Sequence, residues 1–174
     1  MLPMSEENLS IWVVKIDRLL SRHNLWLTTA ESCTGGMLSH VITNLPGVSR
    51  SYLGGVISYA NDIKLKLLGV QTETLVSFGA VSAETAREMA HGVRIACASR
   101  EIPVEKIVGV SITGIAGPGG GSPNKPVGLA WIGIDSNWGS ECHHYVAKGD
   151  RLENKGQFVE QSLSHLLMHL EKIL

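Results

Sequence analysis

The sequence predicts a single α/β domain in which a mixed β-sheet carries helices on both of its faces. Helical repeats and short apolar runs alternate along roughly the first hundred residues, a pattern typical of α/β proteins. Three strand-like runs then follow one another without a long helical pattern between them, which favours neighbouring antiparallel strands. The 174 residues suffice for one core and contain no internal repeat or domain linker, so we expect residues 1–174 to form one domain.

The first predicted elements are a helix, a strand and a second helix. Residues 5–22 are amphipathic, with Ser5 as the expected N-cap. The run "LWLTT" at 25–29 is short and apolar, so it predicts a buried strand leading into the turn of "TTAESCTGG". Helical spacing returns over residues 34–44 and ends at "NLPG". The apolar positions of the two helices are Leu9, Trp12, Val13, Ile16, Leu19, Leu20, Met37, Leu38, Val41 and Ile42.

The remaining elements are predicted by the same signals. A strand over "YLGGVISYA" (52–60) precedes a short helix, "DIKLKLLG" (62–69), which Gly69 stops. Residues 82–99 form a helix capped by Ser82, and strands are expected at 106–114, 127–134 and 141–147. A helix over residues 151–174, capped by Asp150, ends the chain. Its expected core-facing residues are Val159, Leu163, Leu166, Leu167, Leu170 and Leu174.

The composition restricts the classes of partner. Charged residues make up 18% of the chain, below the usual quarter, and the net charge of −1 gives no electrostatic basis for binding nucleic acid or a membrane surface. The N-terminus lacks a signal-peptide pattern, and no apolar run reaches the roughly 18 residues of a membrane span. Three scattered cysteines without a C-x-x-C pair suit the reducing cytoplasm. We expect a soluble cytoplasmic protein, and the low charge also suits a homo-oligomer with covered surface.

The turn after the first predicted strand, "ESCTGG", carries a candidate nucleophile. Ser32 has the alternative role of an ordinary helix N-cap. Gly35 and Gly36 each weaken a helix by roughly 1 kcal/mol relative to alanine, which is tolerable where a ligand must approach the backbone closely. The free N–H groups of a helix start also offer a site for an oxyanion. We favour Ser32 over Cys33, for which the sequence shows no evident histidine and acid partners.

A base for this serine is expected in "ISYANDIK", which places Tyr59 at a strand end and Lys64 five positions later. If Asn61 caps the next helix, Lys64 lies in its first turn, where the helix dipole and partial burial favour the neutral amine. A neutral lysine can act as a general base. Asp62 would oppose this effect if it faced Lys64. The alternative is an interface tyrosine beside a solvated lysine.

A third candidate feature is "SITGIAGPGGGSPNKPVG", which joins two predicted strands. Gly109, Ser111 and Thr113 share one face of the first strand, and the glycine-rich loop after it can present N–H groups to a phosphate. The loop has neither a Walker A lysine nor G-x-G-x-x-G spacing, so a plain flexible loop is the alternative. Arg151 follows the expected cap Asp150 and has two alternative roles: a bidentate contact with a phosphate, or a solvated residue in the first turn. The seven histidines lack metal-binding patterns, so we expect them to have structural or surface roles and expect no metal site.

Five blocks in sequence order resemble the CinA C-terminal domain family over roughly residues 5–170: "TTAESCTGG", "GGVISYANDIK", "GAVSAETAREMA", "SITGIAGPGGGSPNKPVGLAWIGI" and "GDR". The family includes bacterial nicotinamide mononucleotide deamidases. No partner domain precedes the blocks, so the chain resembles the stand-alone form. The resemblance implies a three-layer α/β/α fold and, as part of NAD salvage, hydrolysis of nicotinamide mononucleotide to nicotinate mononucleotide and ammonia.

The resemblance also implies the residues of the site. Ser32, Tyr59 and Lys64 are the expected catalytic set, with the tyrosine relaying or sharing the proton that the lysine takes from the serine. The expected substrate contacts are Thr34, Gly35, Thr113, Gly114, Gly117, Gly120 and Arg151. N–H groups near the first two are expected to hold the oxyanion, and the arginine to lie near the phosphate. This covalent scheme needs no metal and no cofactor.

One position departs from the family pattern. Family members commonly carry a further arginine four positions after that of "GDR", where this chain has Lys155, which keeps the charge but loses the bidentate geometry. Two alternatives to the deamidase stay open, a non-catalytic nucleotide-binding or regulatory paralogue and a serine amidohydrolase for another small carboxamide. A DNA-binding role is disfavoured because the sequence has no basic patch.

Overall fold

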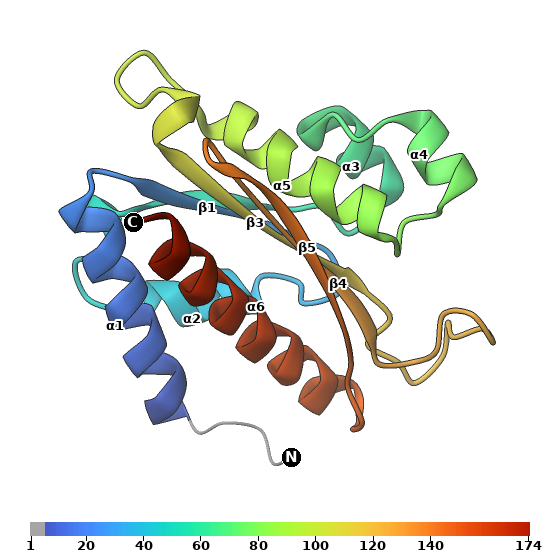
Figure 1. The fold of residues 1–174 in the computed structure, drawn as a ribbon. Helices are drawn as coiled ribbons and strands as arrows, with labels where there is room; N and C mark the ends of the chain where they lie inside the picture. The colour runs from blue at the N-terminus through green and yellow to red at the C-terminus, as the bar shows by residue number, and fades with distance from the viewer. Residues whose placement is uncertain (1–5) are drawn as a thin grey trace.

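Five strands form one mixed sheet in the order β2-β1-β3-β4-β5 (Figure 1). The computed structural model describes residues 6–174. The strands are β1 (Trp26–Glu31), β2 (Tyr52–Ile57), β3 (Ile107–Gly114), β4 (Leu129–Ser136) and β5 (Gly139–Val146). β1 pairs in parallel with β2 and β3, whereas the β3–β4 and β4–β5 pairs are antiparallel. The predicted mixed sheet and the antiparallel order of its last three strands are confirmed.

Helices cover both faces of this sheet, so the domain has the expected three layers (Figure 1). On one face lie α1 (Glu6–Arg22), α2 (Met37–Thr43) and α6 (Arg151–Ile173). On the other face lie α3 (Asn61–Leu68), α4 (Thr72–Ser77) and α5 (Ala83–Cys97). Within residues 6–174, no helix combines the length and apolar character needed to cross a bilayer.

Strand β3 shows how the sequence builds the two sides of the sheet differently. Its apolar residues Val108, Val110 and Ile112 belong to the larger core, which the sheet shares with α1, α2 and α6. The alternate residues face α5, where the Ser111 hydroxyl donates to the carbonyl of Ala86 at 2.6 Å. Because small residues occupy this second face, α5 lies close to the strand backbones. The positions after β3 are thereby fixed against α5.

The predicted helix ends agree closely with the structure at three places. Gly69 ends α3 in a left-handed conformation at φ 65°. The Ser82 hydroxyl accepts a hydrogen bond from the Thr85 N–H at the start of α5. Asp150 and Glu153 form a reciprocal capping box at the start of α6. These caps are local sequence signals, and all three act as predicted.

Five details differ from the expectations or lie outside the described residues. Helix α2 begins at Met37 rather than at residue 34, and the six-residue helix α4 was not predicted. The N-cap of α3 is Ala60 rather than Asn61. Leu174 lies beyond the last helix and is 37% exposed, because the core under α6 ends before it. The expected cap Ser5 lies outside the described residues.

Candidate active site

Ser32 lies directly after the carboxyl end of β1. Its N–H donates to the carbonyl of Ile112 at 2.9 Å, which continues the β1–β3 pairing by one residue. Gly35 and Gly36 lie in the turn before α2, at φ 63° and 98°, and not in the first helical turn as expected. These left-handed conformations suit glycine and end the extended chain sharply. The turn thus places Ser32 at the carboxyl edge of the sheet.

Lys64 reaches this serine from α3. The side chain is 1% exposed, and its Nζ lies 3.0 Å from Oγ of Ser32. Nζ also donates to the carbonyl oxygens of Ser58 and Tyr59, at 2.6 and 3.4 Å. The Ser58 N–H in turn donates to the carbonyl of Glu31 at 2.7 Å, so the end of β2 is tied to the end of β1. Backbone pairing between neighbouring strands therefore sets the distance between lysine and serine.

The surroundings of Lys64 favour its neutral form. Burial lowers the pKa of its amine below the ordinary value for lysine, an effect that the nearby Cys33 partly opposes. Asp62, which would have opposed the shift, is exposed and forms no ion pair with Lys64. A neutral amine has two hydrogens and one lone pair. With the hydrogens directed to two carbonyls, the lone pair is left for the hydroxyl proton of Ser32.

Cys33 has the opposite character. Burial raises the pKa of its thiol to about 12, so the thiolate is scarce at neutral pH. The side chain belongs to the hydrophobic core and also lines the cavity described below. The N–H groups of Cys33 and Thr34 donate to no acceptor on another described residue. The Gly35 N–H, by contrast, donates to the carbonyl of Ser32 at 3.1 Å.

Tyr59 and Arg151 form a pair across the opening of the site. One guanidinium nitrogen, Nη2, donates to the tyrosine hydroxyl at 3.0 Å, and Nη1 donates to the carbonyl of Gly117 at 2.6 Å. Tyr59 is 60% exposed. Within residues 6–174, no direct hydrogen bond joins its hydroxyl to Ser32 or Lys64. The expected sharing of a proton through Tyr59 therefore has no direct contact behind it.

These side chains line one cavity of about 290 Å³. The lining residues are Ser32, Cys33, Tyr59, Asn61, Lys64, Ala80, Val81, Thr113, Gly114, Ile115, Ala116, Gly117, Gly119, Gly120 and Arg151. Eight of the ten predicted site residues are among them. Thr34 and Gly35 are not, and the side chain of Thr34 is fully buried. The cavity has one apolar wall, one glycine-rich wall and a charged rim.

The glycine-rich wall is anchored at both ends. The Thr113 hydroxyl donates to the carbonyl of Ala80 at 2.6 Å, so it holds the loop before α5 rather than pointing freely into the cavity. Lys125 donates to the carbonyl of Phe78 at 2.6 Å.

Lys155 lies on the first turns of α6, and its Nζ would be 3.8 Å from a Cβ placed on Gly35. It forms no hydrogen bond or ion pair within the described chain, so its charge is free near the serine turn.

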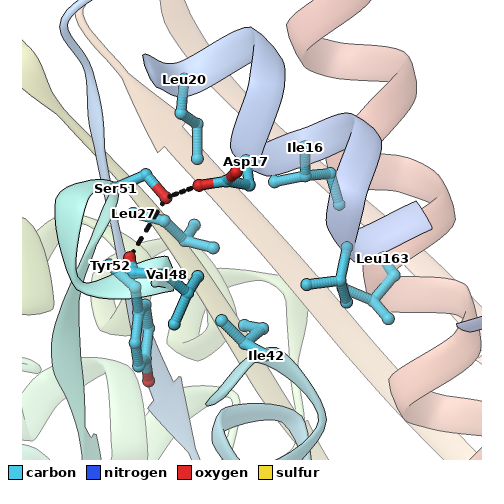
Figure 2. Close-up of a pocket in the computed structure, with 10 residues that line it drawn as sticks. Ile16, Asp17, Leu20, Leu27, Ile42, Val48, Ser51, Tyr52 and Leu163 are labelled. Carbon is cyan, nitrogen blue, oxygen red and sulfur yellow. Dashed lines mark hydrogen bonds between the residues drawn. The ribbon is translucent and has the colours of Figure 1, made fainter. Parts of the chain in front are cut away.

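Three other features carry no comparable chemistry. The void of about 10 Å³ in Figure 2 lies in the core under α1, where Asp17 accepts a hydrogen bond from Ser51, and it is barely large enough for one water molecule. The rings of His143 and His165 stack at 3.9 Å between centroids. Among residues 6–174, no group of three or more His, Cys, Asp or Glu side chains is arranged to hold a metal ion.

Sequence reasoning missed several residues of the site. Asn61 and the apolar wall residues Ala80, Val81 and Ile115 carry no local signal, because only the fold brings them to the serine. Glu31 was also missed, although a carboxylate at the end of a buried strand is unusual.

Comparisons with known proteins agree on one family. The model of the CinA C-terminal domain matches residues 11–170. A curated CinA-like protein of Kosmotoga olearia is 45% identical over 148 residues, which are 85% of this chain and 34% of that protein. The chain thus spans about a third of the length of the curated relatives it matches.

Solved structures share the whole fold. The crystal structure of the competence/damage inducible protein CihA from Agrobacterium tumefaciens is 36% identical, with a TM-score of 0.83, and covers 98% of this chain and 99% of its own. A CinA superfamily protein from Enterobacter cloacae is 32% identical, with a TM-score of 0.84 and coverage of 93% and 92%.

Proposed function

Because this chain belongs to the CinA C-terminal domain family, we propose that it hydrolyses the carboxamide of nicotinamide mononucleotide with Ser32 as the nucleophile. The observation that carries the proposal is the position of the Lys64 amine, 3.0 Å from the serine hydroxyl and shielded from solvent. The family includes nicotinamide mononucleotide deamidases, which supports the choice of substrate. The products are nicotinate mononucleotide and ammonia.

In the first half of the reaction, neutral Lys64 takes the hydroxyl proton of Ser32. The serine oxygen attacks the carboxamide carbon, and the C=O π electrons move onto the oxygen to form a tetrahedral oxyanion. Lys64, now an ammonium, returns its proton to the amide nitrogen as the C–N bond breaks. Ammonia leaves, and an acyl ester remains on the serine oxygen. The same lysine then takes a proton from a water molecule, whose oxygen attacks the ester carbon. The bond between that carbon and the serine oxygen breaks, nicotinate mononucleotide leaves, and Lys64 returns the proton to Oγ of Ser32.

The oxyanion donors in this scheme are the backbone N–H groups of Cys33 and Thr34. The sequence pointed to Thr34 and Gly35, but the Gly35 N–H is already paired with the Ser32 carbonyl. Cys33 lines the cavity and directly follows the nucleophile, which is the position that supplies an oxyanion donor in nucleophile elbows. One such donor is worth about 10²–10³-fold in kcat.

The remaining cavity residues suit the rest of the nucleotide. Arg151 at the rim offers a guanidinium to the phosphate, and the free charge of Lys155 lies on the same helix. The apolar wall of Ala80, Val81 and Ile115 fits an aromatic ring. Tyr59, held by Arg151, would contact the bound nucleotide at the opening. The scheme uses no metal and no cofactor, because covalent catalysis with two oxyanion donors supplies the chemistry.

Measuring ammonia release from nicotinamide mononucleotide tests the proposal. Ser32→Ala should lower kcat by at least about 10³-fold without loss of the fold, as judged by circular dichroism and Tm. Cys33→Ala, the matched control at the next position, should keep most of the activity because its thiol is not ionised. Full activity in Ser32→Ala would remove the serine from the mechanism, and inhibition by a chelator would contradict the metal-free scheme.

Two further measurements separate the alternatives. Comparing nicotinamide mononucleotide with its riboside and with free nicotinamide shows whether the site reads the phosphate, since an amidohydrolase for another small carboxamide would not prefer the mononucleotide. Mass spectrometry of the protein during turnover detects the acyl adduct on Ser32. Tight binding of the nucleotide without adduct or ammonia would favour a non-catalytic nucleotide-binding module.

A further inference from the structure

A buried carboxylate lies directly under the turn of the proposed nucleophile. Glu31, the last residue of β1, is 1% exposed and accepts five hydrogen bonds. Its Oε2 accepts from the Thr34 hydroxyl at 2.7 Å and from the N–H groups of Gly36 and Leu38 at 3.0 Å each. Its Oε1 accepts from the N–H and the hydroxyl of Ser39 at 2.8 and 2.6 Å. Five donors compensate this carboxylate for its removal from water.

A second layer of hydroxyls holds the same carboxylate in place. Oγ of Ser39, which donates to Glu31, accepts a hydrogen bond from the Tyr52 hydroxyl at 2.9 Å. Oγ1 of Thr29 lies 2.9 Å from that serine oxygen and 2.8 Å from the tyrosine oxygen. Thr29 belongs to β1 and Tyr52 to β2. The rigid sheet therefore supports the carboxylate, and the carboxylate supports the turn.

These contacts decide which N–H groups remain for a substrate. The start of α2, which the sequence suggested as an anion site, is filled by the Glu31 carboxylate, and its negative charge there repels a second anion. Within residues 6–174, the N–H groups of Cys33 and Thr34 donate to no other residue. Glu31 itself does not line the cavity.

We propose that Glu31 is a positioning residue for Ser32. By binding the far side of the turn 33–36, it holds the serine oxygen beside Lys64 and keeps the N–H groups of Cys33 and Thr34 next to that oxygen. The inference rests on the proposed function, since only acyl transfer through Ser32 requires this geometry. It assigns Glu31 no contact with substrate and no proton transfer.

The substitution Glu31→Gln tests this role at constant side-chain size. In either orientation, the Gln amide places its NH₂ group against at least one backbone N–H that cannot turn away, so the turn must shift. A displacement of about 1 Å in such a site costs about 10²-fold in rate. Asp17→Asn is the matched control, because Asp17 is another buried carboxylate, hydrogen-bonded to Ser51 under α1 (Figure 2). It does not line the active-site cavity.

Two rates are measured for each protein at a temperature where all are folded. One is phosphonylation of Ser32 by a fluorophosphonate probe, located by mass spectrometry, and the other is ammonia release from nicotinamide mononucleotide. We expect Glu31→Gln to slow phosphonylation and lower kcat about 10²-fold, with KM little changed. Asp17→Asn should lower Tm and leave both rates near those of the wild type.

Each outcome decides between the two claims. Phosphonylation of Glu31→Gln at the wild-type rate overturns the positioning role. The same conclusion follows if Asp17→Asn loses as much phosphonylation rate as Glu31→Gln, or if Ser32 of the wild type does not react with the probe. A wild-type protein that reacts with the probe but releases no ammonia refutes the proposed substrate, while slow phosphonylation of Glu31→Gln still supports positioning. If Glu31→Gln does not fold, Ser39→Ala decides by the same phosphonylation rate, because it removes one of the five donors.

Discussion

At the scale of single residues, Lys64 sets the pH range in which Ser32 reacts. Only the neutral amine accepts the hydroxyl proton, so kcat/KM should rise with pH through the pKa of Lys64 in the free protein. Burial lowers that pKa, so this rise should lie below the value of about 10.4 for free lysine. A pH–rate profile with nicotinamide mononucleotide measures its position. A rise centred at or above the free-lysine value would contradict the assignment.

Replacing this lysine by arginine provides a second, independent check. Lys64→Arg keeps a positive charge but cannot deprotonate, so the rate should fall by about 10²–10⁴-fold at every pH measured. Lys66, two positions later on the same helix, is exposed, and Lys66→Arg is the matched control. Equal rates in Lys64→Arg and Lys66→Arg would show that catalysis does not depend on a neutral amine at position 64.

Single residues also show where sequence reasoning succeeds and where it stops. Ser32 and Lys64 were predicted as a pair because each lies at a recognisable junction, a strand end and the first turn of a helix. The partners of Glu31 and of the Tyr59 hydroxyl could not be predicted. Glu31 binds residues up to eight positions away around a turn of unusual backbone geometry, and Tyr59 contacts Arg151 from the far end of the chain.

At the scale of the elements, α5 packs closely against its neighbours because glycine, which has no side chain, occupies the points of contact. A methyl group on Gly92 would overlap the carbonyl of Leu68 at the end of α3. Gly92→Ala should therefore destabilise the protein by about 1–3 kcal/mol, despite the better helix propensity of alanine. Gly156, in α6, has no atom within 4 Å of the same position, so Gly156→Ala should stabilise by up to about 1 kcal/mol.

Urea denaturation of the two variants measures both free energies of unfolding. If the free energy of unfolding falls in Gly92→Ala and rises in Gly156→Ala, the close approach of α5 to α3 explains the loss of stability at Gly92. A gain in stability for Gly92→Ala would mean that α5 can move away from α3 without loss.

Hydrophobic periodicity predicted the long helices, whereas the errors arise at a helix too short for a repeat and at a turn of unusual backbone geometry. Helices α1, α5 and α6 have enough turns for an apolar stripe to be recognised. Helix α4 has six residues, too few for a repeat to be evident. Helix α2 starts late because Gly35 and Gly36 are in left-handed conformations and Glu31 takes the N–H groups of the first turn.

At the scale of the whole molecule, the site exists only because of the strand order. The carboxyl ends of the parallel strands β2, β1 and β3 meet at one edge of the sheet. Each end delivers one part of the site: the lysine after β2, the serine after β1 and the glycine-rich loop after β3. The place of β1 between β2 and β3 results from crossovers on opposite faces, which no local pattern encodes. The site is therefore a property of the topology as much as of its residues.

The opposite part of the sheet contains a second group of titratable residues, where β5 meets α6. The rings of His143 and His165 stack there at an interplanar angle of 4°. Burial lowers the pKa of His165, and His143 lowers it further against a small opposing effect of Glu141. Hydrogen bonding to Lys172 and, to a lesser degree, contact with His169 lower the pKa of Glu141 to about 2, against the effect of burial.

These shifts predict two separate losses of stability in acid. The unfolded chain binds a proton at His165 near pH 6.5, above the folded value, so the free energy of unfolding should decrease as pH falls from about 6.5 through the folded pKa. Glu141 contributes stability above its ordinary pKa near 4.5, which should be lost as pH falls towards about 2. His165→Phe keeps a ring against His143 and should abolish only the first loss, whereas Glu141→Gln should abolish only the second. Urea denaturation from pH 7.5 to 3 measures both steps, with the exposed His40→Gln as control. A decrease near pH 6 that persists in His165→Phe would assign the first step to another group.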